Sequence, residues 1–174
     1  WNNEAATKEV IDDDGGFRTG DLGRLEDGFL KITGRVKEQF KLENGKYVAP
    51  SPLEESLKLS GLVEQCCVDG RGKIKTFSIV HPNEDALRNG LSAAGISSTG
   101  SFEELCSKAE VREWALNTLK EEVMKVNWKG FEISGGVVLD HEEWTTDNKL
   151  LTPSLKVKRK ALFDRHEEAL AELK

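Results

Sequence analysis

Short apolar–polar alternations separated by turn residues mark the first third of the chain, a pattern typical of β-hairpins. Residues 2–10 are compatible with a short helix or a loop. Leu22–Leu25 and Phe29–Thr33 then predict two strands. Glu26-Asp27-Gly28 between them predicts the turn, because glycine adopts a positive φ without strain.

A second hairpin is predicted a few residues later. Gln39–Leu42 alternates polar and apolar side chains, and Lys46–Val48 returns after Asn44-Gly45, the pair preferred in type I′ turns. The segment Gly34–Lys37 lies between the two hairpins, where a short connection predicts a domain boundary.

From Pro50 onward, helical and strand patterns alternate. Ser51 and Glu54 have the spacing of a capping box, Pro52 suits a first turn, and Gly61 predicts the helix end. Leu62–Val68 and Ile74–Val80 predict strands joined by a turn at 70–73.

Two further helices are predicted in the centre of the chain. Asn83 is placed to cap the first, which extends to about Ala94, and Ser101 and Glu104 form a capping box for the second, which extends to about Lys125. One face of the second helix is apolar at steps of three, four or seven residues: Leu105, Ala109, Leu116, Leu119, Val123 and Val126.

The last part of the chain completes an α+β fold with a small sheet flanked by helices. Phe131–Leu139 predicts a strand, Leu150–Val157 a loop with a short extended piece, and Lys160–Leu173 an amphipathic helix. The chain has 174 residues, which is enough for one domain with a core, or for a small domain with part of a neighbour. It does not begin with methionine, so we expect it to start partway through a larger protein.

Charge and cysteine content exclude several classes of protein. A net charge of −6 argues against general nucleic-acid binding. Three cysteines without a C-x-x-C pair predict neither a disulfide framework nor a zinc site, and they favour a reducing, cytoplasmic compartment. No apolar run reaches the length of a membrane span. Five basic residues and no acidic one lie between Lys149 and Lys160, which suggests either an anionic ligand or a solvated loop.

Three segments carry candidate chemistry. Thr19-Gly20-Asp21 places a carboxylate, the type of group that holds ribose hydroxyls, beside a glycine. Gly34–Lys41 includes Arg35, which is suited to bidentate phosphate binding, with Lys37 and Lys41. Thr152–Arg159 is a basic loop stiffened by proline. Each segment alone is more often an ordinary turn or solvated surface.

The order of the three segments resembles the adenylate-forming enzymes, which include acyl-CoA synthetases, firefly luciferases and peptide-synthetase adenylation domains. The segments Phe40–Pro50, Phe102–Cys106 and Asn148–Arg159 are most similar to the long-chain fatty acyl-CoA synthetases. Leu155 stands where a glycine is usual in the wider superfamily, in agreement with the long-chain branch. Gly16 stands where an aromatic residue is more common.

The resemblance implies the C-terminal portion of an ATP-dependent long-chain fatty acid–CoA ligase. Residues 1–35 would be the end of a large AMP-binding domain and 36–174 a mobile C-terminal domain. The substrates would be fatty acid, ATP and coenzyme A. Mg²⁺ would be bound by the large domain, with no metal ligands in this chain. The phosphate loop and acyl tunnel belong to that domain, so we expect the isolated chain to be inactive.

The resemblance also implies roles for individual residues. In the first half-reaction, Lys156 would bridge the carboxylate and the α-phosphate, Asp21 would bind the ribose, and Arg35 would lie near the nucleotide. In the second, the small domain would rotate about Lys37, and Lys41 would act near the thiol. Gly45 would border the coenzyme A passage.

Alternative predictions are another acyl- or aryl-CoA ligase of the superfamily, or a non-catalytic binding module that kept the fold. The basic loop in 150–159 and the long segment 84–126 favour the long-chain branch over the first. Retention of Asp21, Lys37 and Lys156 argues against the second. Peripheral association of the full-length enzyme with the cytosolic face of a membrane is left open.

Overall fold

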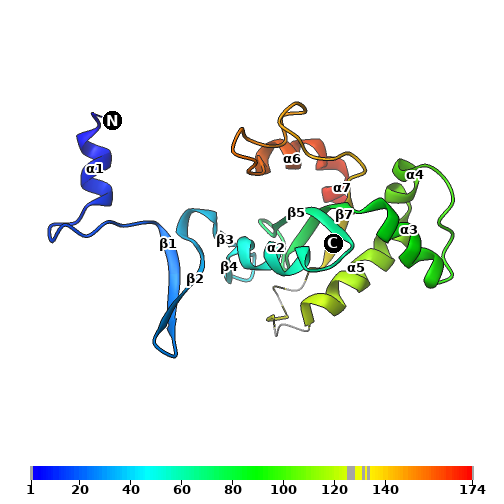
Figure 1. Ribbon diagram of the computed structural model, residues 1–174, viewed down its shortest axis with the longest axis horizontal. Helices are drawn as coiled ribbons and strands as arrows, with labels where there is room; N and C mark the ends of the chain where they lie inside the picture. Colours follow the sequence, from blue (N-terminus) through cyan, green and yellow to red (C-terminus); the bar gives the residue numbers. More distant parts are fainter. Residues whose placement is uncertain (1, 125–127, 131, 133, 174) are drawn as a thin grey trace.

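The structure is a computed structural model, and it describes residues 2–124, 128–130, 132 and 134–173. Helices and strands alternate along the described chain (Figure 1). The helices are α1 (Glu4–Val10), the 3₁₀ turn η1 (Val36–Glu38), α2 (Pro50–Lys58), α3 (Glu84–Ala93), α4 (Phe102–Ser107), α5 (Ala109–Met124), α6 (Arg159–Arg165) and α7 (Glu167–Glu172). The strands are β1 (Asp21–Glu26), β2 (Phe29–Arg35), β3 (Phe40–Lys41), β4 (Tyr47–Val48), β5 (Val63–Asp69), β6 (Phe77–Pro82) and β7 (Gly136–Leu139).

Three small sheets confirm the predicted α+β class. Strands β1 and β2 form one antiparallel hairpin, and β3 and β4 form another. The third sheet has the order β5-β6-β7, with β6 antiparallel to β5 and parallel to β7. The parallel pair requires a crossover, which α3, α4 and α5 provide.

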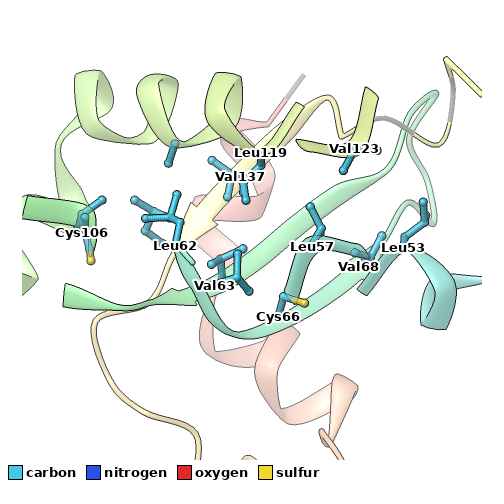
Figure 2. Packing of buried hydrophobic residues seen from close by; sticks show 14 of the residues in the cluster. Leu53, Leu57, Leu62, Val63, Cys66, Val68, Cys106, Leu119, Val123 and Val137 are labelled. Atoms are coloured by element: carbon cyan, nitrogen blue, oxygen red, sulfur yellow. The ribbon is translucent and has the colours of Figure 1, made fainter. Parts of the chain in front are cut away.

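The three-stranded sheet is buried on both faces. One face packs against helices α2 and α5, and Figure 2 shows Leu119 and Val123 of α5 facing Val137 of the sheet. The other face is covered by residues from the loop before α6 and from α6 itself, including Leu150, Leu151 and Leu162. Because successive strand residues point to opposite faces, Cys66 belongs to the first cluster and Cys67 to the second.

The first hairpin and α1 extend away from the body that surrounds the three-stranded sheet (Figure 1). Its predicted turn is confirmed, since Asp27 and Gly28 have φ values of 51° and 82°. Large apolar side chains on this hairpin are exposed, namely Leu25, Phe29, Leu30 and Ile32.

The turn chemistry of the second hairpin differs from the prediction. Gly45 has a φ of 82°, but Asn44 is not among the residues with positive φ. The amide of Leu42 donates to the Lys46 carbonyl, and the amide of Gly45 donates to Leu42. The connection is therefore a three-residue loop that ends in a left-handed glycine, and the predicted type I′ turn is wrong.

The predicted capping box at the start of α2 is also wrong. Ala49 is the N-cap residue, and no side chain caps the helix. The Ser51 hydroxyl instead donates to Glu38, and the Glu54 carboxylate accepts from the Val68 amide. The helix ends at Lys58 without a left-handed Gly61, so that predicted C-cap is wrong as well.

The strand predicted from Ile74 begins three residues later, at Phe77. Backbone groups of the preceding loop bond to the second hairpin: the Lys73 carbonyl accepts from the Glu43 amide, and the Ile74 carbonyl accepts from Asn44. These hydrogen bonds hold the loop away from the sheet.

The caps predicted at Asn83 and Ser101 are confirmed. The second of these helices is interrupted, however, because Lys108 has extended backbone angles between α4 and α5. The interruption shifts the apolar face, so Ala109 is exposed and Leu116 is only half-buried, while the buried residues of α5 are Val111, Ala115, Leu119 and Val123.

Parts of two predicted elements lie outside the described residues: Lys125 and Val126 of the predicted helix, and residues 131 and 133 of the predicted strand. Of the described remainder of that strand, only Gly136–Leu139 forms β7, so the strand is shorter than predicted. The predicted last helix is divided into α6 and α7 at His166, whose φ and ψ are −108° and 21°.

Candidate functional site

Asp21 and Arg35 face each other across the first hairpin. They are paired in the strand register, and Arg35 Nε lies 2.9 Å from Asp21 Oδ1. The Asp21 side chain is 26% exposed, and its backbone amide donates to Thr19 Oγ1 over 3.1 Å. Arg35 contacts Asp21 Oδ1, and a carboxylate has about four lone-pair positions, so the group can also accept bonds from hydroxyl donors.

The nearby Gly16 occupies a crowded position. Its amide donates to Asp12 Oδ1 over 2.6 Å, and a Cβ built on Gly16 would lie 2.6 Å from Asp12 Oδ2. A larger side chain here would displace the Asp12 carboxylate. Gly16 stands at a position where the resemblance leads us to expect an aromatic residue.

Lys37 lies in the 3₁₀ turn η1 between the two hairpins, and it is exposed. The turn is preceded by Gly34, whose φ of 149° and whose approach to Ala49 exclude a side chain, since a Cβ there would lie 2.9 Å from the Ala49 Cβ. The backbone entering η1 is therefore positioned by close contact with the start of α2.

Lys41 and Gly45 lie on the second hairpin. The ammonium of Lys41 is 5.8 Å from the centre of the Tyr47 ring, within the range of a cation–π contact. The nearest atom to a Cβ at Gly45 would be Lys41 Cε at 3.9 Å, so the space beside this glycine is open. Its positive φ, rather than crowding within the chain, disfavours a side chain here.

Lys156 projects from the tip of a tight loop. Leu151 and Val157 form an antiparallel bridge at its base, and the amide of Lys158 donates to the Leu150 carbonyl over 2.8 Å. At the tip, Thr152 Oγ1 accepts from the Lys156 amide over 3.1 Å.

Leu155 lies at the bend of the same tip, with a φ of 59°. Glycine adopts this left-handed conformation without strain, in agreement with the glycine that the resemblance leads us to expect at this position. Leu155 is 72% exposed, so its side chain gains little from packing. The Lys156 side chain is exposed beside it.

Two residues absent from the predicted site, Arg159 and Glu54, form a charged pair at the base of the loop. Arg159 Nη2 donates to Glu54 Oε1 over 2.6 Å, and Arg159 Nη1 donates to the Val68 carbonyl over 2.8 Å. Burial is the largest influence and by itself lowers the pKa of the Arg159 guanidinium. The electrostatic interactions with Cys67 and Glu54, together with the hydrogen bond to Glu54, raise this pKa above its ordinary value. The sequence predicted Glu54 as part of a capping box, but its carboxylate bonds to Arg159 and to the Val68 amide and does not cap α2.

Two of the predicted site residues, Lys37 and Lys41, line one cavity of about 480 Å³. Its cationic residues are Lys37, Lys41, Arg71 and Arg159. Asp69 also lines it and accepts a bidentate pair of bonds from Arg71. The structure thus brings Lys37 and Lys41 together, and it pairs Asp21 with Arg35. Lys156 is not among the lining residues, and Figure 1 draws its loop apart from the first hairpin.

A second buried polar cluster surrounds Asp140, whose side chain is 1% exposed. It accepts from Trp144 Nε1 over 3.0 Å and from His166 Nε2 over 2.8 Å. Burial is the largest influence and by itself raises the pKa of Asp140, but the hydrogen bonds and charge of His166, with the bond from Trp144, lower the pKa below its ordinary value.

The three cysteines are free thiols and are buried. Burial raises the pKa of each of them, Cys66, Cys67 and Cys106, to about 12. Within the described residues there is no group of three or more acidic, histidine or cysteine side chains that could hold a metal ion. No helix in the described parts of the chain is long and apolar enough to cross a bilayer.

Comparison with known proteins reveals extensive sequence similarity. No family model matches the chain. It is 34% identical over 172 residues to long-chain-fatty-acid–CoA ligase 1 of Schizosaccharomyces pombe, a match that covers 97% of this chain and 25% of the relative. It is 41% identical over 156 residues to long-chain-fatty-acid–CoA ligase 5 of Mus musculus, which covers 88% of this chain and 22% of the relative. The chain therefore spans about a quarter of the length of the curated relatives that it matches.

Solved structures show the same fold. The adenylation domain of a carboxylate reductase from Mycobacterium chelonae matches with a TM-score of 0.76 and 25% identity, covering 99% of this chain and 25% of that one. The adenylation domain of a carboxylic acid reductase from Segniliparus rugosus, in complex with AMP and a co-purified carboxylic acid, matches with a TM-score of 0.77 and 24% identity, covering 99% and 25%. The resemblance to adenylate-forming enzymes, with its α+β fold, is thereby confirmed.

Proposed function

The chain is homologous, over nearly its whole length, to a segment of the long-chain fatty acid–CoA ligases, and from this relationship we propose that it is the C-terminal part of an ATP-dependent ligase of that type. The ligase would convert a fatty acid, ATP and coenzyme A into acyl-CoA, AMP and pyrophosphate. The observation that carries the proposal is the identity of 34–41% to these ligases. The ordered segments at Asp21, Gly34–Lys41 and Thr152–Arg159 support it.

In the first half-reaction, the fatty acid carboxylate attacks the α-phosphorus of ATP and pyrophosphate leaves. We assign Lys156 to the two anions that approach each other in this step. Its exposed side chain projects from the tip of a loop whose base is buried. A charge held in this way can reach into the active site of another domain while its backbone stays fixed. Asp21 would accept hydrogen bonds from the ribose hydroxyls, and Arg35, already paired with Asp21, would lie beside the nucleotide.

In the second half-reaction, the thiol of coenzyme A attacks the acyl carbonyl and AMP leaves. The small domain would rotate about Lys37, removing Lys156 from the site and bringing in the hairpin that carries Lys41 and Gly45. The position of Lys37, exposed in a short turn between the two hairpins, is that of a hinge residue at the end of an element. The open space beside Gly45 suits a position that borders the thiol passage.

We place the domain boundary between residues 35 and 36. The first hairpin exposes large apolar side chains at Leu25, Phe29 and Leu30, as expected for a segment that is covered by the remainder of a large domain. Mg²⁺ is proposed to bind in that domain, as the resemblance implies, and no step is assigned to a metal here. We further propose a cytoplasmic protein, since its buried thiols suit a reducing compartment.

The test is the substitution Lys156→Ala in the full-length ligase. Acyl-adenylate formation, measured by exchange of pyrophosphate into ATP, should fall by about 10²–10³-fold, the usual loss when one transition-state charge contact is removed. Formation of acyl-CoA from supplied acyl-adenylate should persist.

Lys158→Ala is the matched control, because Lys158 is an exposed lysine two residues away and its backbone, not its side chain, bonds to the loop base. It should exchange pyrophosphate normally. Normal exchange in Lys156→Ala would overturn the assignment, and a large loss in Lys158→Ala would show that the catalytic lysine is misassigned.

A further inference from the structure

The loop that carries Lys156 has a buried base and an exposed tip. Leu150 and Leu151 at the base are only 4% and 8% exposed, and they pack on one face of the three-stranded sheet. The tip residues Pro153–Lys156 are exposed. The Lys156 amide donates to Thr152 Oγ1 and the Thr152 amide donates to the Lys156 carbonyl, so a movement of the base would also move the tip that carries Lys156.

Arg159 fixes this base to an edge of the sheet. Strand β5 is an edge strand, so alternate peptide groups on its outer side have no neighbouring strand. The Val68 peptide is satisfied there by side chains: Arg159 Nη1 donates to its carbonyl over 2.8 Å, and Glu54 Oε1 accepts from its amide over 2.8 Å. The bond between Arg159 Nη2 and Glu54 Oε1, 2.6 Å long, closes the ring of contacts.

These contacts also join the loop to the second hairpin. Glu54 lies on α2, and a single residue separates this helix from the hairpin strand β4. Arg159 also lines the same cavity as Lys37 and Lys41. One guanidinium thus links the base of the Lys156 loop, the edge of the sheet and the helix that continues from the hairpin.

Resting on the function proposed above, we propose that Arg159 is a positioning residue for the adenylation half-reaction, holding the base of the loop so that Lys156 reaches the reacting anions. Only a planar guanidinium can donate at the same time to the Val68 carbonyl and the Glu54 carboxylate in this geometry. A lysine carries its three N–H donors on a single nitrogen, so it cannot place donors at both guanidinium positions and would weaken at least one of these contacts. Arg159 itself, with a 26% exposed side chain occupied by protein acceptors, does not contact substrate in this assignment.

The experiment compares Arg159→Ala and Arg159→Lys with the wild-type full-length ligase in both half-reactions. A displacement of about 1 Å can cost about 10²-fold in rate, so the kcat of acyl-adenylate formation should fall by about 10- to 100-fold in Arg159→Ala. The KM for ATP should stay nearly unchanged. Thioester formation from supplied acyl-adenylate should change by less than about threefold, and Arg159→Lys should lose an intermediate amount of adenylation.

A matched control separates positioning from general loss of stability. Ser101→Ala removes the capping box of α4, remote in sequence from this loop, and should lower the melting temperature without lowering adenylation. Arg159→Lys serves the same comparison if Arg159→Ala does not fold. Equal losses in both half-reactions, or an adenylation loss in Arg159→Lys no larger than that in Ser101→Ala at a similar melting temperature, would overturn the inference.

Failure of this inference is distinguishable from failure of the proposed function. An inactive wild-type enzyme, or normal exchange in Lys156→Ala, would defeat the function assigned to the chain. An inactive Lys156→Ala together with a fully active Arg159→Ala would overturn the role of Arg159 alone.

Discussion

Replacing Asp140 by alanine should be among the most destabilising single changes in the protein. The substitution removes the acceptor of Trp144 Nε1, which belongs to a side chain that is 1% exposed, and the acceptor of His166 Nε2. It also removes the carboxylate next to Arg165, whose Nε lies 3.5 Å from Asp140 Oδ2. Each buried donor left without a partner costs about 1–3 kcal/mol.

The expected loss is about 3–5 kcal/mol, the range found when one partner of a buried charged pair is removed. Against a typical stability of about 5–15 kcal/mol, this is a large fraction. Urea unfolding of the 174-residue chain, followed by tryptophan fluorescence, would measure it. His81 Nδ1 bonds to the backbone carbonyl of Asp140, so that contact should remain in the variant.

The pH dependence provides a second test on Asp140→Asn, which keeps the shape and removes the charge. Because the pKa of Asp140 is lowered in the folded state, its carboxylate stabilises the fold fully above the unfolded-state pKa of about 4. This contribution is lost as the pH falls through the folded-state pKa. The difference in stability between wild type and Asp140→Asn should therefore shrink as the pH falls below about 4.

A loss in Asp140→Ala below about 1 kcal/mol, the centre of the range for point mutations in general, would refute the argument. So would a difference between wild type and Asp140→Asn that does not change with pH in the acid range. Glu143→Ala is a suitable control, because Glu143 is exposed and only its backbone carbonyl is bonded, to Asn148.

Four further outcomes are expected. Leu155→Gly should stabilise the chain by about 1 kcal/mol, because Leu155 has a φ of 59° and an exposed side chain, and a lower melting temperature would show that its conformation is not strained. Native Cys66, Cys67 and Cys106 should react with a thiol reagent at least about 100-fold more slowly than in urea, since their pKa values are about 12 and they are buried, and rapid native labelling would contradict this. The isolated chain should bind ATP more weakly than micromolar in calorimetry, because a micromolar Kd would require about 8 kcal/mol from this part alone. Lys37→Pro in the full-length ligase should hold one domain orientation and abolish one half-reaction, because proline fixes φ at the hinge, while Lys37→Ala should do much less. Full activity of Lys37→Pro would place the hinge elsewhere.

Local chemistry accounts for the elements that could be predicted from sequence. The Asp27-Gly28 turn, the Asn83 cap and the capping box of Ser101 and Glu104 each depend on groups within four residues of one another, so their partners are fixed by the chain itself. Period-two alternation likewise determined that Cys66 and Cys67 pack on opposite faces of one strand. The ordered segments that carry Asp21, Lys41 and Lys156 led from the sequence to the family resemblance.

Tertiary structure decided the partners of the charged residues. Glu54 has the spacing of a capping residue, but it bonds to Arg159, 105 residues away, because the close approach of the two segments offers a stronger, charge-assisted partner than the helix end. The cluster around Asp140 forms in the same way, since His166 reaches it only after α6 covers the sheet. Under the proposed assignment, the rate of acyl-adenylate formation depends on such long-range contacts, because they position Lys156. Hydrophobic patterning leaves these contacts undetermined. It specifies which face of an element is buried, and not which distant side chain that face meets.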